Sequence, residues 1–285
     1  MRVLKGHGTE NDFVLLPDLD GELELTPALV RALCDRRAGI GADGVLRVVR
    51  SDRHPEAAAM AADAPFFMDY RNADGSLAEM CGNGIRVFLR YLQRAGLVEV
   101  QAVVAVATRG GIKRVQAGTG GEVTVGMGQP RLGTERPVVT AAGAPGVAAT
   151  ATVEMPNPHV IVELASRAAL AAVDLSRAPA VEPARPDGQN VEFVVRAGQR
   201  LLAMRVYERG VGETRSCGTG ICAVVVAIAA ADGAGADGST WQVEVPGGSC
   251  SVVWRADGEV LLAGPAVLVA ELELDDDWLA RARNG

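Results

Sequence analysis

The 285-residue sequence is poor in aromatic residues, has only three histidines and lacks any long hydrophobic run. Aromatic residues make up 4% of it and hydrophobic residues 48%, so small aliphatic side chains must fill the core. The longest apolar stretch, residues 221–231, is too short to cross a bilayer, and residues 1–7 contain no apolar stretch typical of a secretory signal. These absences predict a cytoplasmic globular protein of one large domain or two ordinary ones.

An excess of positive charge is also absent. The formal net charge is −7, and the basic residues are scattered along the chain. Proteins that bind nucleic acid or anionic membranes usually concentrate Lys and Arg on one face. We therefore expect no nucleic-acid partner and no membrane partner.

The five cysteines show neither a Cys-x-x-Cys motif nor a compact spacing. An odd number in a chain expected in the cytoplasm favours reduced thiols over structural disulfides. Cys34, Cys222 and Cys250 lie inside apolar helix or strand patterns, so we expect them to be inert and buried. Cys81 and Cys217 stand in a different context, because each precedes a glycine-rich turn.

Two segments around these cysteines are nearly identical. Residues 81–84 read Cys-Gly-Asn-Gly and residues 217–220 read Cys-Gly-Thr-Gly, each after an acidic loop and before an apolar helical run. The first N–H groups of a helix have no intrahelical partner and carry the positive end of the helix dipole. Each cysteine is therefore predicted at a helix N-terminus, where a thiolate or a bound carboxylate is favoured. A buried core cysteine is the alternative for each.

The repetition extends along the chain. The phrase at 11–13 is echoed at 157–159, and Gly44 lines up with Asn190, in both cases 146 positions further on. The cysteines are only 136 positions apart, so the first half carries about ten extra residues. We place this insert at 51–65, as a surface loop that would leave His54 exposed to solvent. Two copies of one domain explain the pattern.

The two strongest helix patterns follow the cysteines, at 85–94 and 221–231. The second is apolar on every side, which predicts a helix enclosed by a curved sheet. A third helix is expected over 28–36, with Thr26 before it and Pro27 at its first position. Elsewhere short Val-, Leu- and Ile-rich strands alternate with Gly, Pro and Asp turns.

Further motifs connect these features over almost the whole chain, and together they resemble those of the diaminopimelate epimerase family. They are Lys5-Gly6-His7-Gly8, Asn11-Asp12-Phe13, Gly41-Ala42-Asp43, Asn72-Ala73-Asp74-Gly75-Ser76, Asn157-Pro158-His159, Tyr207-Glu208-Arg209-Gly210-Val211-Gly212-Glu213-Thr214, Pro246-Gly247-Gly248 and Gly264-Pro265-Ala266, in addition to the two cysteine phrases. One departure is Gly44, where several family members carry Gln, so a side-chain contact there is lost or replaced.

The resemblance implies an α+β fold with two pseudo-symmetric domains, each a barrel-like mixed sheet around a central helix, and an active site in the interdomain cleft. The N-terminal domain would comprise 1–125 and 266–285, the C-terminal domain 126–265, and the last strand, near 267–274, would return to the first. The implied reaction interconverts LL- and meso-2,6-diaminopimelate, in lysine and cell-wall precursor biosynthesis, without pyridoxal phosphate, another cofactor or a metal. A small-molecule amino acid is the expected partner, and a homodimer is the assembly considered.

The resemblance also implies a set of site residues. Cys81 and Cys217 would be the acid and base, with His159 and Glu208 as auxiliary groups beside them, and Glu208 and Arg209 would hold the amino and distal carboxylate groups. The catalytic positions are Cys81, Cys217, His159 and Glu208, and the substrate-binding positions are Asn11, Asn72, Gly82, Asn83, Asn157, Asn190, Glu208, Arg209, Gly218 and Thr219. Taken singly, His159 and the asparagines would pass as turn residues.

Physical chemistry makes this reading intelligible. Inversion at an α-carbon needs a base on one face and an acid on the other, and two cysteines with pKa values lowered at helix N-termini supply both. Helix N–H groups aimed at the substrate carboxylate would stabilise the charge that develops there. Three alternatives remain: a proline or hydroxyproline racemase of the same fold, a redox protein with a Cys81–Cys217 disulfide, and a non-catalytic amino-acid-binding protein.

Overall fold

The computed structural model describes residues 1–118 and 120–284. The chain forms two compact units, one of Met1–Val125 with Pro265–Gly285 and one of Gly126–Gly264. Pro265, assigned above to the C-terminal domain, falls in the first unit. It lies two residues before the strand Val267–Glu273, which belongs to that unit. Among the described residues, no helix is long and apolar enough to span a membrane.

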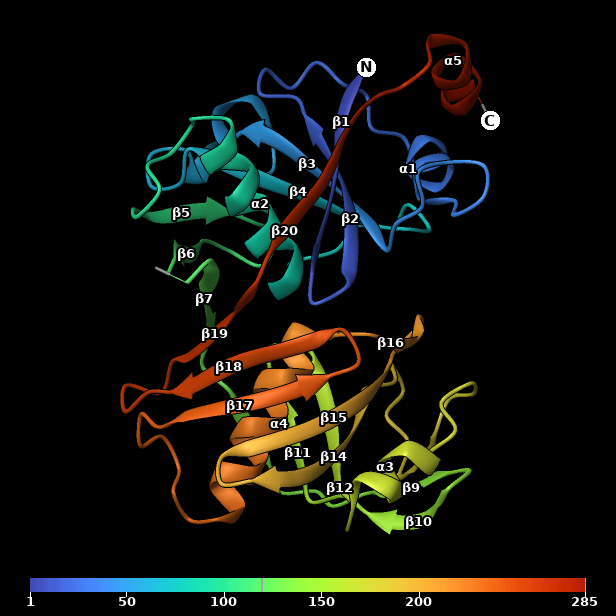
Figure 1. The fold of residues 1–285 in the computed structure, drawn as a ribbon, viewed down its shortest axis with the longest axis vertical. Coiled ribbons are helices and arrows are strands. Elements are labelled where there is room, and N and C mark those ends of the chain that lie inside the picture. The colour runs from blue at the N-terminus through green and yellow to red at the C-terminus, as the bar shows by residue number, and fades with distance from the viewer. Residues whose placement is uncertain (119, 285) are drawn as a thin grey trace. The chain divides into compact units, whose positions relative to one another are not determined.

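The first unit is built on a mixed sheet (Figure 1). The strand pairs β2–β3 and β4–β5 are parallel, and the other neighbouring pairs among β20 and β1 to β6 are antiparallel, as is β6–β7. In order across the sheet, the strands are β20 (Val267–Glu273), β1 (Arg2–Gly8), β2 (Asn11–Pro17), β3 (Gly44–Arg50), β4 (Phe66–Asn72), β5 (Val103–Ala107), β6 (Lys113–Ala117) and β7 (Glu122–Gly128).

Helix α2 (Gly82–Arg94) is the central helix of this unit. It contacts β1, β2, β3, β4, β6 and β20, and its residues from 82 to 89 are all buried. Two shorter helices pack together at the outside, α1 (Pro27–Cys34) and the C-terminal α5 (Asp276–Asn284). The side chain of Thr26 accepts a hydrogen bond from the Leu29 N–H, so the predicted capped helix is confirmed.

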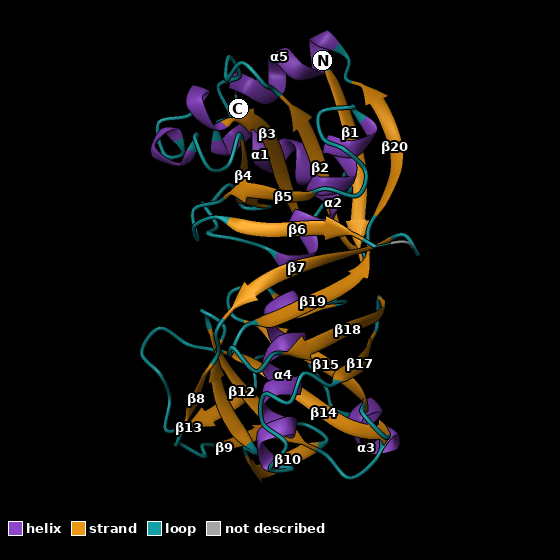
Figure 2. Cartoon of the chain, turned by 90° about the vertical axis from the view of Figure 1, so that its left-hand side faces the viewer, coloured by secondary structure: helices purple, strands orange, loops and turns teal. Residues whose placement is uncertain are grey.

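The second unit repeats this plan, and Figure 2 shows its strands around one long helix. Strand β16 (Gly212–Thr214) extends the β15 edge, and a separate small sheet contains β10 (Ala144–Ala148), β9 (Val138–Ala141) and β13 (Ala180–Glu182). Across the main sheet the order is β8 (Arg131–Gly133), β11 (Ala151–Glu154), β12 (Pro158–Glu163), β14 (Asn190–Gly198), β15 (Leu201–Glu208), β17 (Thr240–Val245), β18 (Gly248–Trp254) and β19 (Val260–Pro265).

The long helix is α4 (Gly218–Ala231), which contacts β11, β12, β14, β15, β17 and β18. Every residue from Gly220 to Ala229 is buried. A helix with apolar residues on all sides is stable in water only when other elements cover every side. The sheet of the second unit supplies that cover, as its sequence predicts. The short helix α3 (Arg167–Ala172) packs on β14 and β15.

The strand register confirms the duplication. Phe13 pairs with Gly44 in the parallel β2–β3 ladder, and His159 pairs with Asn190 in the parallel β12–β14 ladder, both 146 positions further on. In the next, antiparallel ladders, Val45 faces Arg71 and Val191 faces Tyr207. Val45 and Val191 are 146 positions apart, whereas their partners Arg71 and Tyr207 are 136 apart, like the two cysteines. The expected α+β fold with two pseudo-symmetric domains, each a mixed sheet around a central helix, is thus confirmed.

The change of offset places the extra residues between β3 and β4. There the chain forms two short 3-10 turns, Ser51–Arg53 and Ala58–Met60, whereas β14 and β15 are joined by a tight turn. The expectation that His54 is exposed is wrong, because only 8% of the residue is accessible. Its ring packs on Phe67, with ring centroids 4.7 Å apart, and Nε2 lies 3.9 Å from the Asp69 carboxylate.

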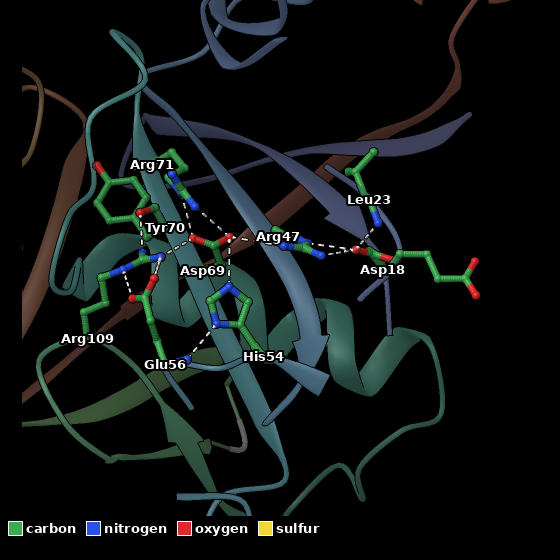
Figure 3. Close-up of polar contacts among 10 residues, drawn as sticks. Asp18, Leu23, Arg47, His54, Glu56, Asp69, Tyr70, Arg71 and Arg109 are labelled. Carbon is green, nitrogen blue, oxygen red and sulfur yellow. Dashed lines mark hydrogen bonds and ion pairs between the residues drawn. The ribbon is translucent and has the colours of Figure 1, made fainter. Parts of the chain in front are cut away.

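Asp69, on β4, is the centre of a buried ion cluster that holds the insert in place (Figure 3). Its carboxylate accepts hydrogen bonds from Arg71 Nε at 2.8 Å and Arg109 Nη2 at 2.7 Å. Arg109 also pairs with Glu56 of the insert, with Nε 2.5 Å from Oε2. Burial raises the pKa of Asp69, but the two arginines outweigh burial and leave that pKa below its usual value. The cluster ties the insert to β4.

Candidate functional site

Cys81 lies at the N-cap position of α2, as the glycine-rich motif predicts. The Gly84 N–H donates to its sulfur across 3.4 Å, so one of the unpaired N–H groups of the helix end is directed at the thiol. Gly84 itself is tightly enclosed, since a Cβ there would lie 3.2 Å from Leu46 and 3.4 Å from Phe13. Cys81 is only partly buried.

Asn11 and Asn83 form a small polar network beside this sulfur. Asn11 Oδ1 lies 3.5 Å from Cys81 Sγ, which can donate to it as a thiol, and 3.2 Å from Asn83 Nδ2. The other end of the Asn11 amide donates to Asp43 Oδ2 at 2.7 Å, which fixes the orientation of the amide. The acceptor side of Asn11 is thereby turned towards the cysteine.

Four charged side chains form a cluster of ion pairs next to Asn11. Asp12 accepts from Arg36 at 2.8 and 3.0 Å and from Lys5 at 2.6 Å, and Arg36 also pairs with Asp43 at 2.7 Å. Burial raises the pKa of Asp12, but the hydrogen bonds from Arg36 and Lys5 hold it well below its usual range. Burial raises the pKa of Asp43. The motifs at 5–8 and 41–43 thus hold the start of β2.

Asn72 lies apart from the Asn11–Asn83 network, at the end of β4 and opposite Gly44. Its Nδ2 donates to Ser76 Oγ at 3.0 Å. A Cβ on Gly44 would lie 2.6 Å from Arg71 O and 2.7 Å from the Tyr70 ring. The space that a side chain would need at position 44 is therefore taken by the Arg71 carbonyl and the Tyr70 ring.

Cys217 caps α4 in the second unit and is more enclosed, with 5% of the residue accessible. Its sulfur lies 3.4 Å from Thr219 Oγ1 and 4.0 Å from Asn190 Nδ2. Burial and the nearby Glu208 and Glu192 carboxylates raise the pKa of the Cys217 thiol well above its usual value. The Thr219 hydroxyl and the helix N–H groups offset only part of this effect.

Glu208, at the end of β15, is the acidic group nearest to Cys217. It accepts a hydrogen bond from the Thr214 hydroxyl on β16 and is hydrogen-bonded to Cys217. Burial raises the pKa of the Glu208 carboxyl, and the hydrogen bonds from Thr214 and Cys217 offset this in part. Glu208 occupies the place in β15 that Asn72 occupies in β4, and the residue type differs between the halves.

His159 and Glu192 form a buried pair on the neighbouring strands β12 and β14. His159 Nδ1 lies 2.6 Å from Glu192 Oε1, and Nε2 lies 3.1 Å from Asn157 Oδ1. The accessible fractions are 1% for His159 and 0% for Glu192. Glu192 was missed as a candidate, although one signal was present: it is the single charged residue in the run 190–195, on the strand face shared with Asn190.

Arg209 is exposed and follows Glu208 at the end of β15. Its backbone N–H donates to Asn190 Oδ1 at 2.9 Å, and Nη1 donates to the Asp187 carbonyl at 3.0 Å. The first contact holds the Asn190 amide with its Nδ2 towards Cys217. The structure therefore brings Asn190, Glu208, Thr219 and Cys217 together and connects Arg209 to them through its backbone.

The remaining cysteines differ from Cys81 and Cys217 in their surroundings. None of the five, all of which lie in the described residues, forms a disulfide, and Cys34, Cys222 and Cys250 are buried, as predicted. Burial raises the pKa of Cys34 to about 12. Such a thiol stays protonated and unreactive near neutral pH.

The fold is shared with solved structures of low sequence identity. A phenazine biosynthesis protein of the PhzF family from Bacillus anthracis matches with a TM-score of 0.73 at 16% identity, over 96% of this chain and 99% of that chain. A probable proline racemase from Agrobacterium radiobacter K84 matches with a TM-score of 0.66 at 17% identity, over 97% and 93%. These matches show the class of fold: two similar units, each with a mixed sheet around a central helix that a cysteine caps.

The chain belongs to the diaminopimelate epimerase family, whose model matches residues 3–133 and 151–269. It is 55% identical over 282 residues to the diaminopimelate epimerase of Streptomyces coelicolor, covering 97% of this chain and 96% of that protein. The identity to the diaminopimelate epimerase of Thermobifida fusca is 53% over 279 residues, covering 95% and 97%. The protein is accordingly an isomerase.

Proposed function

We propose that this isomerase interconverts LL- and meso-2,6-diaminopimelate by a two-base mechanism in which Cys81 and Cys217 exchange the α-proton. The observation that carries the proposal is the placement of both cysteines, and of no other cysteine, at the N-caps of the two central helices. Family membership and the high identity to two diaminopimelate epimerases support the choice of substrate.

The mechanism requires one sulfur on each face of the α-carbon. The Cys81 thiolate takes the α-proton, and the electron pair left on carbon spreads into the adjacent carboxylate. The Cys217 thiol then donates its proton to the opposite face, so that Cys81 ends as a thiol and Cys217 as a thiolate. The raised pKa of Cys217 supports its role as the protonated partner in this direction. The reverse reaction exchanges the two roles.

The helix N-termini supply the stabilisation that a cofactor would otherwise provide. In the proposed complex the N–H groups at Gly82–Asn83 and Gly218–Thr219 are donors to the carboxylate, where negative charge grows in the transition state. A donor set that is already oriented needs no reorganisation during the reaction, and removing one such donor typically lowers kcat by about 10²–10³-fold. Neither pyridoxal phosphate nor a metal has a step in this scheme.

Polar residues around each cysteine take auxiliary roles. We assign Glu208 to the amino group of the substrate and to the proton of Cys217, to which it is hydrogen-bonded. His159, held by Glu192 and Asn157, is assigned as a positioned polar group beside the site. Asn11, Asn72, Asn157 and Asn190 are assigned as substrate ligands, and Arg209 as the bidentate partner of the distal carboxylate.

The biological setting follows from the substrate. Diaminopimelate connects the reaction to lysine and cell-wall precursor biosynthesis, and we propose a cytoplasmic location and a homodimeric assembly. Size-exclusion chromatography with light scattering tests the assembly, since a monomer at micromolar concentration would contradict the dimer.

The deciding experiment is incubation of the purified protein with LL-diaminopimelate in deuterated water. Inversion accompanied by uptake of one deuterium at the inverted α-carbon supports the proposal. Turnover of proline or hydroxyproline in parallel samples, with none of diaminopimelate, would instead favour the racemase alternative. Binding without inversion would favour an amino-acid-binding protein, and redox cycling of Cys81 with Cys217 would favour the thiol redox alternative.

A further inference from the structure

Arg86 lies on α2, in the second turn after Cys81, and is completely buried, with 0% of the residue accessible. A guanidinium carries its positive charge at any working pH and has five N–H donors. Taking such a cation out of water is costly unless it is paired and hydrogen-bonded. A fully buried arginine in the helix that carries the proposed base therefore requires an explanation.

The hydrogen bonds of Arg86 are few and are directed at neutral groups. Nη2 donates to Thr9 Oγ1 and to Asn83 Oδ1, each at 3.0 Å, while Nε and Nη1 have no hydrogen-bond partner among the described residues. The backbone makes room for this arrangement at Gly8, where a Cβ would lie 3.0 Å from Nη2 and 2.9 Å from Asn83 O. The charge of Arg86 is thus held in place and left without a carboxylate hydrogen-bond acceptor.

The hydrogen bonds continue from Arg86 to the sulfur. Asn83 receives the guanidinium on Oδ1, which turns its Nδ2 towards Asn11 Oδ1 at 3.2 Å. Asn11 Oδ1 is also the acceptor for the Cys81 thiol. An acceptor at the sulfur favours the protonated thiol, whereas the Gly84 N–H and a nearby positive charge favour the thiolate. The positive charge of Arg86 therefore favours the thiolate form of Cys81.

The second half of the chain has no such cation at the equivalent place. The residue 136 positions further on is Cys222, which is buried in α4. Instead, the acidic side chains of Glu192 and Glu208 lie near Cys217 and raise its pKa. The duplicated helices therefore differ in the sign of the charge beside their cysteines, positive near Cys81 and negative near Cys217.

We propose that Arg86 is a positioning residue for Cys81: it orients Asn83 and, through its buried charge, lowers the pKa of the Cys81 thiol into the range where the sulfur can both accept and donate a proton. This inference rests on the proposed catalytic role of Cys81. A base that must exchange a proton in both directions works best with a pKa near the operating pH.

Other charged side chains also lie on the elements around Cys81 and α2, and several of them pair with one another. Next to Asn11 these are Asp12 and Asp43, balanced by Lys5 and Arg36. The further charged groups on the strands and turns packed against α2 are Arg2, His7, Glu10, Arg47, Arg50, Asp69, Arg71, Lys113, Arg114, Glu271 and Glu273. Like Asp43, Arg86 is hydrogen-bonded to the network that reaches the sulfur, but Arg86 brings a positive charge to it.

The test is the rate of alkylation of Cys81 by iodoacetamide as a function of pH, followed by peptide mass analysis so that the other cysteines do not interfere. In Arg86→Gln the apparent pKa of Cys81 should rise by about one pH unit, the size expected for a unit charge within one to two helical turns. The acidic limb of the pH profile of kcat/KM should move to higher pH by the same amount. Arg86→Lys keeps the charge and loses the planar fork, so the alkylation pKa should stay near that of the wild type while kcat falls.

Arg90→Gln is the matched control, because Arg90 lies on the same helix, one turn further from Cys81, and donates to the Gly121 carbonyl. It should leave the alkylation profile unchanged. An unchanged Cys81 profile in folded Arg86→Gln would overturn the electrostatic role, and a fully active Arg86→Lys would overturn the positioning role. If Arg86→Gln does not fold, Arg86→Lys still decides the second point. The alkylation readout does not depend on turnover, so an active Cys81→Ala enzyme would reject the proposed function separately.

Discussion

Glu192 Oε1 lies 2.6 Å from His159 Nδ1 and would lie only 2.7 Å from a Cβ placed on Gly220. The Gly218-Thr219-Gly220 turn at the start of α4 therefore packs closely against the Glu192 carboxylate, which holds His159. In the first half the residue at the place of Glu192 is Leu46, so only the second half has this acidic support.

Replacing either helix-capping cysteine should stop the reaction. We expect Cys81→Ala and Cys217→Ala each to abolish epimerisation, because each removes one of the two groups that transfer the proton. Circular dichroism and thermal unfolding should show both variants folded. Turnover near that of the wild type in either variant, with no metal or pyridoxal phosphate added, would reject the two-thiol mechanism.

Glu192 should matter for activity through His159. Glu192→Gln keeps the shape but removes the negative charge beside His159 Nδ1, which weakens the hydrogen bond that orients the ring, and we expect kcat to fall by about tenfold or more. Glu163→Gln, on the neighbouring strand and paired with Arg196 at the surface, is the control. Equal kinetic constants for Glu192→Gln and the wild type would show that the pair is only structural.

Arg209 should determine specificity for the second amino-acid head. Arg209→Lys is expected to lower kcat/KM for diaminopimelate severely, because an ammonium group cannot reproduce the bidentate geometry of the guanidinium. A site whose polar groups lose their partner can discriminate by as much as about 10⁴–10⁵-fold, so lysine and proline should be rejected. Comparable turnover of proline, or an unaffected Arg209→Lys enzyme, would show that the distal head is recognised elsewhere.

The ion cluster at Asp69 should make the first unit sensitive to acid. Burial lowers the pKa of His54, so this histidine contributes stability above about pH 6.5 that is lost as the pH falls towards its lowered value. The pKa of Asp69 is also lowered, and its contribution is lost only below about pH 4. His54→Gln should therefore flatten the fall in unfolding temperature between pH 7 and 5. An unchanged slope would contradict this linkage.

The same cluster allows a stability measurement at neutral pH. Asp69→Asn leaves Arg71 and Arg109 without their common carboxylate, and breaking a buried ion pair in this way typically costs about 3–5 kcal/mol. Urea unfolding of this variant measures the loss. Asp20→Asn is a suitable control, since the Asp20 carboxylate is exposed and its nearest cation, Arg50, is 3.7 Å away.

The sequence predicted features that recur in both halves or follow from hydrophobic periodicity. The equivalence of Phe13 with His159 and of Gly44 with Asn190 followed from the common offset. The enclosed helix α4 followed from its apolar pattern. The position of both cysteines at helix N-termini followed from the glycine-rich motifs. These features depend on short stretches of chain and on their repetition.

Features produced by packing between distant segments could not be read from the sequence. Glu192 became a site residue only when β12 and β14 were placed side by side, and His54 was buried by Phe67, on the following strand. The exclusion of a side chain at Gly44 depends on the position of the Tyr70 ring. Each of these outcomes is decided by the tertiary neighbours rather than by the local pattern.

The insert at 51–65 has a consequence for the symmetry of the enzyme. Glu56 of the insert holds Arg109, and the turn that carries Arg109 donates from the Gly110 N–H to the Glu79 carbonyl at 3.0 Å, two residues before Cys81. Shortening the first half to the length of the second would therefore remove a support of the loop that precedes Cys81, a proposed catalytic residue. The two halves are therefore not equivalent, because a protein built from two copies of the second half would lack this support.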